Sequence, residues 1–160
     1  MNAGIAMAVA MAIAVVWPGL PSPKAAAIPT GSCTDHPAHA QLLLQAGRKL
    51  GIAVRQGSPE LAGKDASYRA LHGRPGVITI KPRPMAPAVR CQLITHEFIH
   101  VLQHFGARLR GVEPLGWPLS PGERSRFGSL QEAEAYAYQN QPALVWQLLE
   151  AHRLDPTRPK

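Results

Sequence analysis

The chain has 160 residues, 46% of them hydrophobic, and 17 Lys and Arg against 10 Asp and Glu give it a formal net charge of +7. This length fits one compact domain. The basic residues are dispersed in short pairs, without the concentrated basic stripe or interleaved aromatic residues of nucleic-acid-binding proteins, so nucleic acid is excluded as a partner. An anionic cell-envelope surface is a candidate partner for the excess charge, and an ordinary solubilising surface is the simpler interpretation.

The first 27 residues differ in composition from the rest of the chain. Residues 1–17 carry no charged side chain, and Ala25-Ala26-Ala27 offers a small-x-small cleavage site. The apolar run of about 15 residues is shorter than the roughly 20 that a membrane-spanning helix needs. We therefore expect a signal peptide over 1–27, export to the periplasm or the cell exterior, and one domain over 28–160 without a transmembrane segment. No Lys or Arg precedes the apolar run, so an uncleaved anchor or a misassigned start is the alternative.

Cys33 and Cys91 are the only two cysteines of the chain. In an oxidising compartment an isolated pair favours one disulfide. The long loop that this bond closes corresponds to roughly 4 kcal/mol of stabilisation on the chain-entropy model. Neither cysteine belongs to a CxxC pair, which argues against the alternative of two metal ligands. A lipid-modified Cys33 is a weaker alternative, because the residues before it are a poor lipidation motif.

The residues up to about 81 predict one helix and a small sheet. The helix begins at the N-cap signal Thr34-Asp35 and ends at Leu50, before a glycine. A short strand over 52–54 follows. Two further strands, over 66–72 and 76–81, flank a Gly-Arg-Pro-Gly turn.

The second half of the chain predicts helices. Prolines at 82, 84 and 87 exclude regular structure until about residue 87, where a second helix begins and runs to about 105. Residues 106–128 contain five glycines and three prolines and predict a long loop. Ser129 opens a third helix, which bends or restarts at Pro142 and continues to about His152. Helix, sheet, helix, loop and helix make an α+β pattern.

The second helix carries the segment His96-Glu97-Phe98-Ile99-His100. Residues four apart lie one turn apart on the same face, so His96 and His100 can converge on one cation. Glu97 lies about 100° around the helix from His96, which suits a base that reaches a metal-bound water better than a third ligand. The apolar residues lie on the other side: Ile94, Phe98, Val101 and Phe105. This spacing is the HExxH pattern of zinc sites, and an amphipathic helix with solvent-facing histidines is the structural alternative.

Residues 95–104 resemble the active-site helix of the zincin metallopeptidases. The longer metzincin signature, HExxHxxGxxH, does not fit, because residue 103 is Gln and residue 106 is Gly. His104 lies about 12 Å of helix rise beyond His96, near the limit for two imidazoles on one zinc. We therefore expect His104 on the surface or behind a ligand.

The gluzincin pattern is closer, because its third ligand is a Glu on a following helix. Residues 131–138, Gln-Glu-Ala-Glu-Ala-Tyr-Ala-Tyr, are similar to the segment that carries this ligand. The match places Glu132 at the ligand position, with Glu134 as the alternative. Tyr136 stands where an Asp commonly supports a ligating histidine. Ser129 and Glu132 also fit a capping box, which gives Glu132 a purely structural alternative.

The resemblance implies a small zincin-like domain with an active-site helix, a short antiparallel sheet, a ligand-bearing helix and one catalytic zinc. The implied activity is hydrolysis of peptide or protein substrates by a zinc-activated water, with Glu97 as general base. Residues 77–80 resemble the zincin edge strand, to which an extended substrate adds. His104, Tyr136 and Tyr138 are candidates for supporting a ligand or stabilising an oxyanion. The alternatives are a catalytically inactive zinc-bound domain that binds cell-envelope components and a structural domain without metal.

Overall fold

A computed structural model describes residues 31–154 of the chain. The described part contains α1 (His39–Lys49), β1 (Ala53–Gln56), β2 (Ala66–Leu71), β3 (Arg74–Ile80), α2 (Pro87–Gly106), α3 (Pro121–Arg126), α4 (Leu130–Tyr138) and α5 (Pro142–Leu154). The predicted α+β class is confirmed. The expected signal peptide over residues 1–27 lies outside the described residues. Within residues 31–154, no helix combines the length and the apolar character that crossing a membrane requires.

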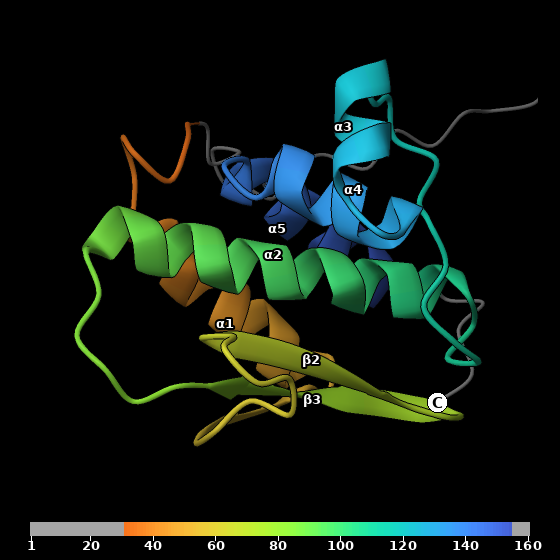
Figure 1. The fold of residues 1–160 in the computed structure, drawn as a ribbon. Coiled ribbons are helices and arrows are strands. Elements are labelled where there is room, and N and C mark those ends of the chain that lie inside the picture. Colours follow the sequence, from red (N-terminus) through yellow and green to blue (C-terminus); the bar gives the residue numbers. More distant parts are fainter. Residues whose placement is uncertain (1–30, 155–160) are drawn as a thin grey trace, which may run out of the picture.

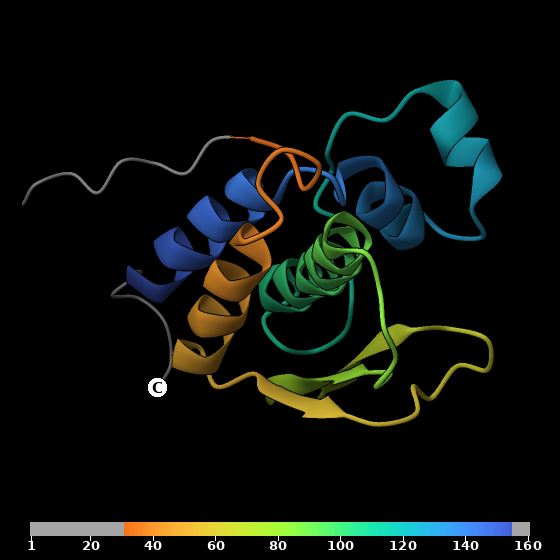
Figure 2. The same cartoon turned by 90° about the vertical axis from the view of Figure 1, so that its left-hand side faces the viewer.

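Helix α2 runs through the middle of the fold, with the sheet on one side and α4 and α5 on the other (Figure 1). Figure 2 looks nearly along α2 and shows α1 and α5 packed together beside it. Because neighbours surround α2, every residue from Ile94 to Phe105 is buried, the histidine face included. The alternative of solvent-facing histidines is therefore wrong.

The contact between α1 and α2 depends on a glycine. A Cβ atom at Gly47 would lie 2.4 Å from a ring carbon of Phe98, so only glycine lets the two helices approach this closely. Phe98 is fully buried in the core, together with aliphatic residues of α1, β3 and α5 such as Leu43, Ile78 and Leu149. The apolar face of α2 thus fixes the helix in the core and directs its opposite face toward β2 and α4.

The sheet has the order β1-β3-β2 and is mixed. The expectation of an antiparallel sheet holds for β2 and β3, which are joined by a tight turn with Gly73 at φ 72°. It is wrong for β1, which pairs with β3 in parallel. Because β3 lies between the other two strands, residues 77–80 do not form the predicted edge strand. The strand that packs against α2 at the edge of the sheet is β2.

Two element boundaries also differ from the expectations, while the restart at Pro142 agrees with them. Helix α1 begins at His39 rather than near residue 34, because the Asp35 carboxylate accepts a hydrogen bond from the Ser32 hydroxyl (2.7 Å) instead of capping the helix. The loop over 106–128 contains the short helix α3, which a complete capping box of Ser120 and Glu123 begins. The predicted restart at Pro142 is a full break between α4 and α5.

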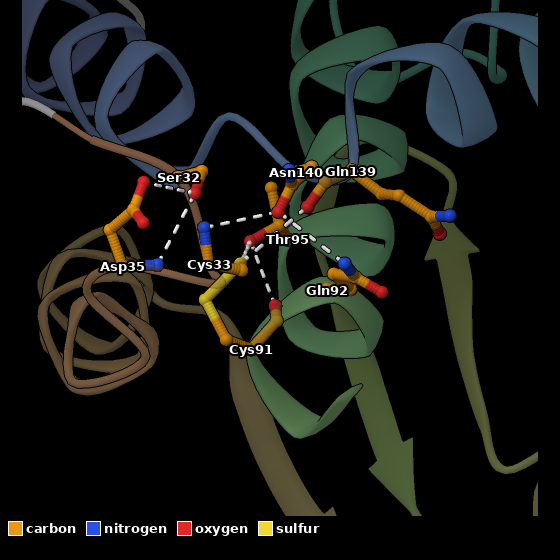
Figure 3. The surroundings of a disulfide bond; sticks show 8 residues. All are labelled: Ser32, Cys33, Asp35, Cys91, Gln92, Thr95, Gln139 and Asn140. Carbon is orange, nitrogen blue, oxygen red and sulfur yellow. Dashed lines mark hydrogen bonds between the residues drawn. A yellow bond between two sulfur atoms is a disulfide. The ribbon is translucent and has the colours of Figure 1, made fainter. Parts of the chain in front are cut away.

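The predicted disulfide between Cys33 and Cys91 is confirmed, with Cα atoms 5.5 Å apart (Figure 3). It joins the segment before α1 to the first turns of α2. Asn140, between α4 and α5, accepts hydrogen bonds at the same place from the Cys33 backbone amide (3.1 Å) and from the Gln92 side chain (3.4 Å). The disulfide therefore lies where three separate segments meet, and it is typical of a protein in an oxidising, exported location.

Candidate metal centre

Three of the predicted site residues converge on one point. The Nε2 atoms of His96 and His100 lie 3.2 Å apart on α2. From α4, the Glu132 carboxylate places one oxygen 3.1 Å from Nε2 of His100 and the other 3.6 Å from Nε2 of His96. Within the described part of the chain, these three residues form the group that could hold a metal ion.

The spacing of these atoms suits a small tetrahedral ion. Zinc binds imidazole nitrogen and carboxylate oxygen at about 2.0–2.2 Å, which sets neighbouring ligand atoms of a tetrahedron about 3.3 Å apart. The two Nε2 atoms lie 3.2 Å apart, and each of them lies 3.1 to 3.6 Å from one of the two oxygens of the Glu132 carboxylate, close to that value. Three protein ligands would leave a fourth position for water or substrate, the arrangement of catalytic rather than structural zinc.

The side chain of Glu132 reaches the two histidines, although Glu132 lies in the first turn of α4 and could have capped that helix instead. The Ser129 hydroxyl caps α4 by accepting a hydrogen bond from the Glu132 backbone amide (3.3 Å). The Glu132 side chain does not return to the Ser129 backbone, as it would in a full capping box, but faces the two histidines. The carboxylate is therefore available as a ligand.

The electrostatics of the metal-free cluster follow from these contacts. Hydrogen bonds to His100 and His96 hold the pKa of Glu132 well below its ordinary value, against the opposing effect of burial. Burial by itself lowers the pKa of His100, but hydrogen bonds to Glu132 and Gln103 outweigh it, and the net shift is upward. The Glu132 carboxylate therefore stays ionised, as a metal ligand must be, and a metal ion that binds His100 would displace a proton from it.

A buried glutamine orients His100. The Nδ1 atom of His100 lies 2.8 Å from Oε1 of Gln103, an acceptor, so Nδ1 carries a proton, and the neutral imidazole would present the lone pair of Nε2 to the cluster. The Gln103 amide is itself fixed, because its Nε2 donates to the Gln131 carbonyl and to the Glu134 carboxylate, both at 3.0 Å. This support of a ligand is what a metal site needs beyond its first contacts.

Glu134, the alternative third ligand, has another role. Its buried carboxylate accepts hydrogen bonds from the backbone amides of Leu115, Gly116 and Trp117 at 2.7–3.0 Å, in addition to the one from Gln103. The side chain is directed into the loop between α2 and α3 rather than toward the histidines. Glu134 thus anchors that loop and, through Gln103, connects it to His100.

Glu97 lies beside the cluster and is only 4% exposed. Burial raises the pKa of its carboxyl group above the ordinary value, while the neighbouring His96 and His100 oppose the rise. A carboxylate with a raised pKa accepts a proton more readily at neutral pH, as a general base requires.

A cavity of about 330 Å³ opens onto these groups. Its walls come from α2, from Val112 of the loop between α2 and α3, from the start of α4, and from β2 with the segment before it. Three consecutive residues of the edge strand, Ala66, Ser67 and Tyr68, face it, and so does Lys64. None of these was singled out from the sequence, because a strand edge and a lone lysine carry no local signal for a site.

The three auxiliary candidates have different positions. Tyr136 packs the edge of its ring against His96, with ring centroids 4.6 Å apart, which fits a residue that supports a ligand. His104 is fully buried, so its expected surface position is wrong; its Nδ1 lies 2.7 Å from the Tyr68 hydroxyl. Tyr138 donates to the Pro118 carbonyl (3.0 Å) and packs against Trp117, so it is not placed to stabilise an oxyanion.

Comparison with protein-family models, with curated proteins and with solved structures finds no match for this chain. The function of this protein is therefore inferred from the geometry of the site.

Proposed function

We propose that this protein is a zinc-dependent metallopeptidase, with His96, His100 and Glu132 as the zinc ligands and Glu97 as the general base. The observation that carries the proposal is the convergence of three ligand atoms beside a buried carboxylate, at the wall of an open cavity. A purely structural metal site needs neither a free position nor a base, and this arrangement offers both.

Zinc, when bound, would polarise the substrate carbonyl and lower the pKa of a water molecule. Glu97 takes a proton from the attacking water and passes it to the leaving amine. Gln103 keeps His100 in the tautomer that presents Nε2. Tyr136 restricts the ring of His96 from the side of α4.

The substrate in this proposal is an extended peptide that adds to β2. The Asp65 carbonyl accepts a hydrogen bond from the Lys81 amide (2.8 Å), so Asp65 is turned toward β3. Backbone groups of an antiparallel strand alternate in direction, and those of Ala66 and Tyr68 therefore point to the free edge. Both residues line the cavity, and the Tyr68 backbone donates a hydrogen bond to Glu97 there. The main-chain groups of this edge that remain free would hold a peptide beside the cluster.

The place of action proposed here is outside the cytoplasm. The disulfide favours an oxidising compartment, and the composition of residues 1–27 predicts a signal peptide. Peptides and proteins of the periplasm or the cell exterior are then the available substrates.

Hydrolysis of a broad peptide library by wild type and by Glu97→Gln, both loaded with zinc, tests this proposal. The amide has nearly the same size and keeps all three ligands, but it cannot accept the proton. We expect equal zinc content in the two proteins and a fall in hydrolysis of about 10²–10⁴-fold or more. A wild type that holds zinc yet cleaves nothing would refute the peptidase and favour an inactive domain that binds cell-envelope components.

A further inference from the structure

Lys64 belongs to the wall of the cavity, opposite the proposed metal ligands. It lies in the segment before β2, and its Nζ donates a hydrogen bond to the Tyr136 hydroxyl (3.2 Å). The same nitrogen lies 5.6 Å from the centre of the Tyr136 ring. Stacking of Phe127 on Tyr136, with ring centroids 4.3 Å apart, holds this tyrosine in place. The ammonium group therefore has a defined position although the lysine is exposed.

Lys64 has no counter-ion of its own in the structure. Several other exposed cations of the fold do, since Arg69 pairs with Glu60, Arg83 with Asp65 and Arg153 with Glu150. Among residues 31–154, no carboxylate lies within ion-pair distance of Lys64. The hydrogen bond to Tyr136 and, at longer range, the charges of Glu132 and Glu97 raise the pKa of Lys64. With zinc bound, these two carboxylates would balance the metal, and the charge of Lys64 would be available to a molecule that enters the cavity.

The charges around the cavity leave one positive charge in excess. A divalent ion held by neutral His96 and His100 would be balanced by the carboxylates of Glu97 and Glu132. The remaining lining residues are uncharged except for Lys64. A substrate that brings one negative charge next to the metal centre would therefore complete the balance, whereas a cationic group there would be repelled.

We propose that Lys64, positioned by Tyr136, binds a carboxylate of the substrate peptide beside the cleavage site. The Tyr136 hydroxyl accepts the hydrogen bond from Lys64, so its own proton can be donated to the same carboxylate. This inference rests on the proposed peptidase function and adds a substrate class to it.

The distance between Lys64 and the metal centre limits which carboxylate can bind. Tyr136 follows Glu132 by one turn of α4, about 6 Å along the helix axis. An extended peptide advances about 3.3–3.6 Å per residue. The carboxylate therefore belongs to a residue one or two positions from the scissile bond, and it comes either from an acidic side chain or from the peptide C-terminus.

Equilibrium binding to zinc-loaded Glu97→Gln protein tests the inference without cleavage. The probes are fluorescent peptides of one sequence in three forms: an internal Glu with an amidated C-terminus, an internal Gln with a free C-terminus, and an internal Gln with an amidated C-terminus. The variants are Lys64→Met and Tyr136→Phe. Lys81→Met is the matched control, because Lys81 is also exposed but lines a different pocket, away from the proposed metal centre.

We expect one of the two carboxylate peptides to bind more tightly than the neutral one, and its identity distinguishes the side chain from the C-terminus as the source. Lys64→Met should weaken that peptide about 5- to 20-fold and leave the neutral peptide unchanged. Tyr136→Phe should cause a smaller loss, and Lys81→Met none. Added salt should weaken the carboxylate peptide selectively.

Equal binding of all three peptides, or equal losses in Lys64→Met and Lys81→Met, would overturn the inference. A uniform fall in wild-type cleavage of every peptide on removing Lys64, with no change in binding preference, would also overturn it. Wild-type cleavage without any carboxylate preference would refute this inference and leave the peptidase intact. Carboxylate-dependent binding without any cleavage by wild type would support the binding role of Lys64 and refute the proposed peptidase activity.

Discussion

Replacement of Gln103 by Leu tests whether the buried network behind His100 supports metal binding. Leu has a similar volume and suits a fully buried position, but it removes three hydrogen bonds: those to His100, to the Gln131 carbonyl and to Glu134. Glu134 keeps its three backbone donors. The Nδ1–H group of His100 loses its partner and stays buried, whereas the Gln131 carbonyl keeps its place in the helical hydrogen-bond pattern of α4.

The size of the effect follows from these losses. One buried polar group without a partner costs about 1–3 kcal/mol and each of the two other lost hydrogen bonds about 0.5–1.5 kcal/mol, so we expect the metal-free protein to lose about 2–6 kcal/mol of unfolding free energy. Loss of the group that orients a ligating histidine typically weakens metal binding 10- to 100-fold, and we expect a change of about that size in the zinc Kd. Urea denaturation in EDTA gives the first quantity, and competition with a chromophoric zinc chelator gives the second.

Leu149→Ala separates positioning from general destabilisation. Leu149 is fully buried on α5, which contributes no residue to the cavity. Its truncation should cost a similar 2–5 kcal/mol and leave the zinc Kd unchanged. If Gln103→Leu weakened zinc binding no more than Leu149→Ala, the proposed role of Gln103 would be refuted.

Three further predictions follow from other contacts. Alkylation without reduction should detect no free thiol, and the double change of Cys33 and Cys91 to Ser should cost about 4 kcal/mol in urea denaturation; two alkylated cysteines would contradict the disulfide. Tyr68→Phe removes hydrogen bonds to His104 and Gly76 and should cost about 1–3 kcal/mol, so an unchanged unfolding free energy would argue against this buried link. Glu134→Ala should make residues 112–118 more sensitive to limited proteolysis, and wild-type protection would show that the loop is held by other contacts.

The helices of this fold could be predicted because their signals are local. The i, i+4 spacing of His96 and His100, the apolar face around Phe98, and Ser129 before α4 each depend on a few neighbouring residues. The prediction of Glu132 comes instead from the resemblance of residues 131–138 to the ligand-bearing segment of the gluzincins, and it leaves Glu134 as the alternative. Confirmed boundaries such as Pro87 and the break at Pro142 likewise follow from proline itself.

The sheet order could not be predicted from local patterns. The pattern of residues 77–80 predicts a strand. Its central position in the sheet, however, depends on the parallel pairing of β1 with β3 across a long connection. The roles of Gln103 and Glu134 could be recognised only in the structure. Gln103 binds Glu134 of a later helix, and Glu134 binds a backbone amide of the loop after α2, so both contacts join residues that are distant in the sequence. Gln103 did carry a signal, since it is one of the two residues that depart from the metzincin signature.

The central claim is that His96, His100 and Glu132 bind one zinc ion. Calorimetric titration of the metal-free protein with zinc, followed by the same titration of single Ala variants, tests it most directly. Glu123→Ala is a control, because Glu123 is an exposed carboxylate that caps α3. We expect one zinc per wild-type chain and no change in Glu123→Ala. We also expect a loss of at least about 100-fold in affinity in His96→Ala, His100→Ala and Glu132→Ala. Zinc binding that survives both histidine changes, or no binding by wild type, would contradict the account.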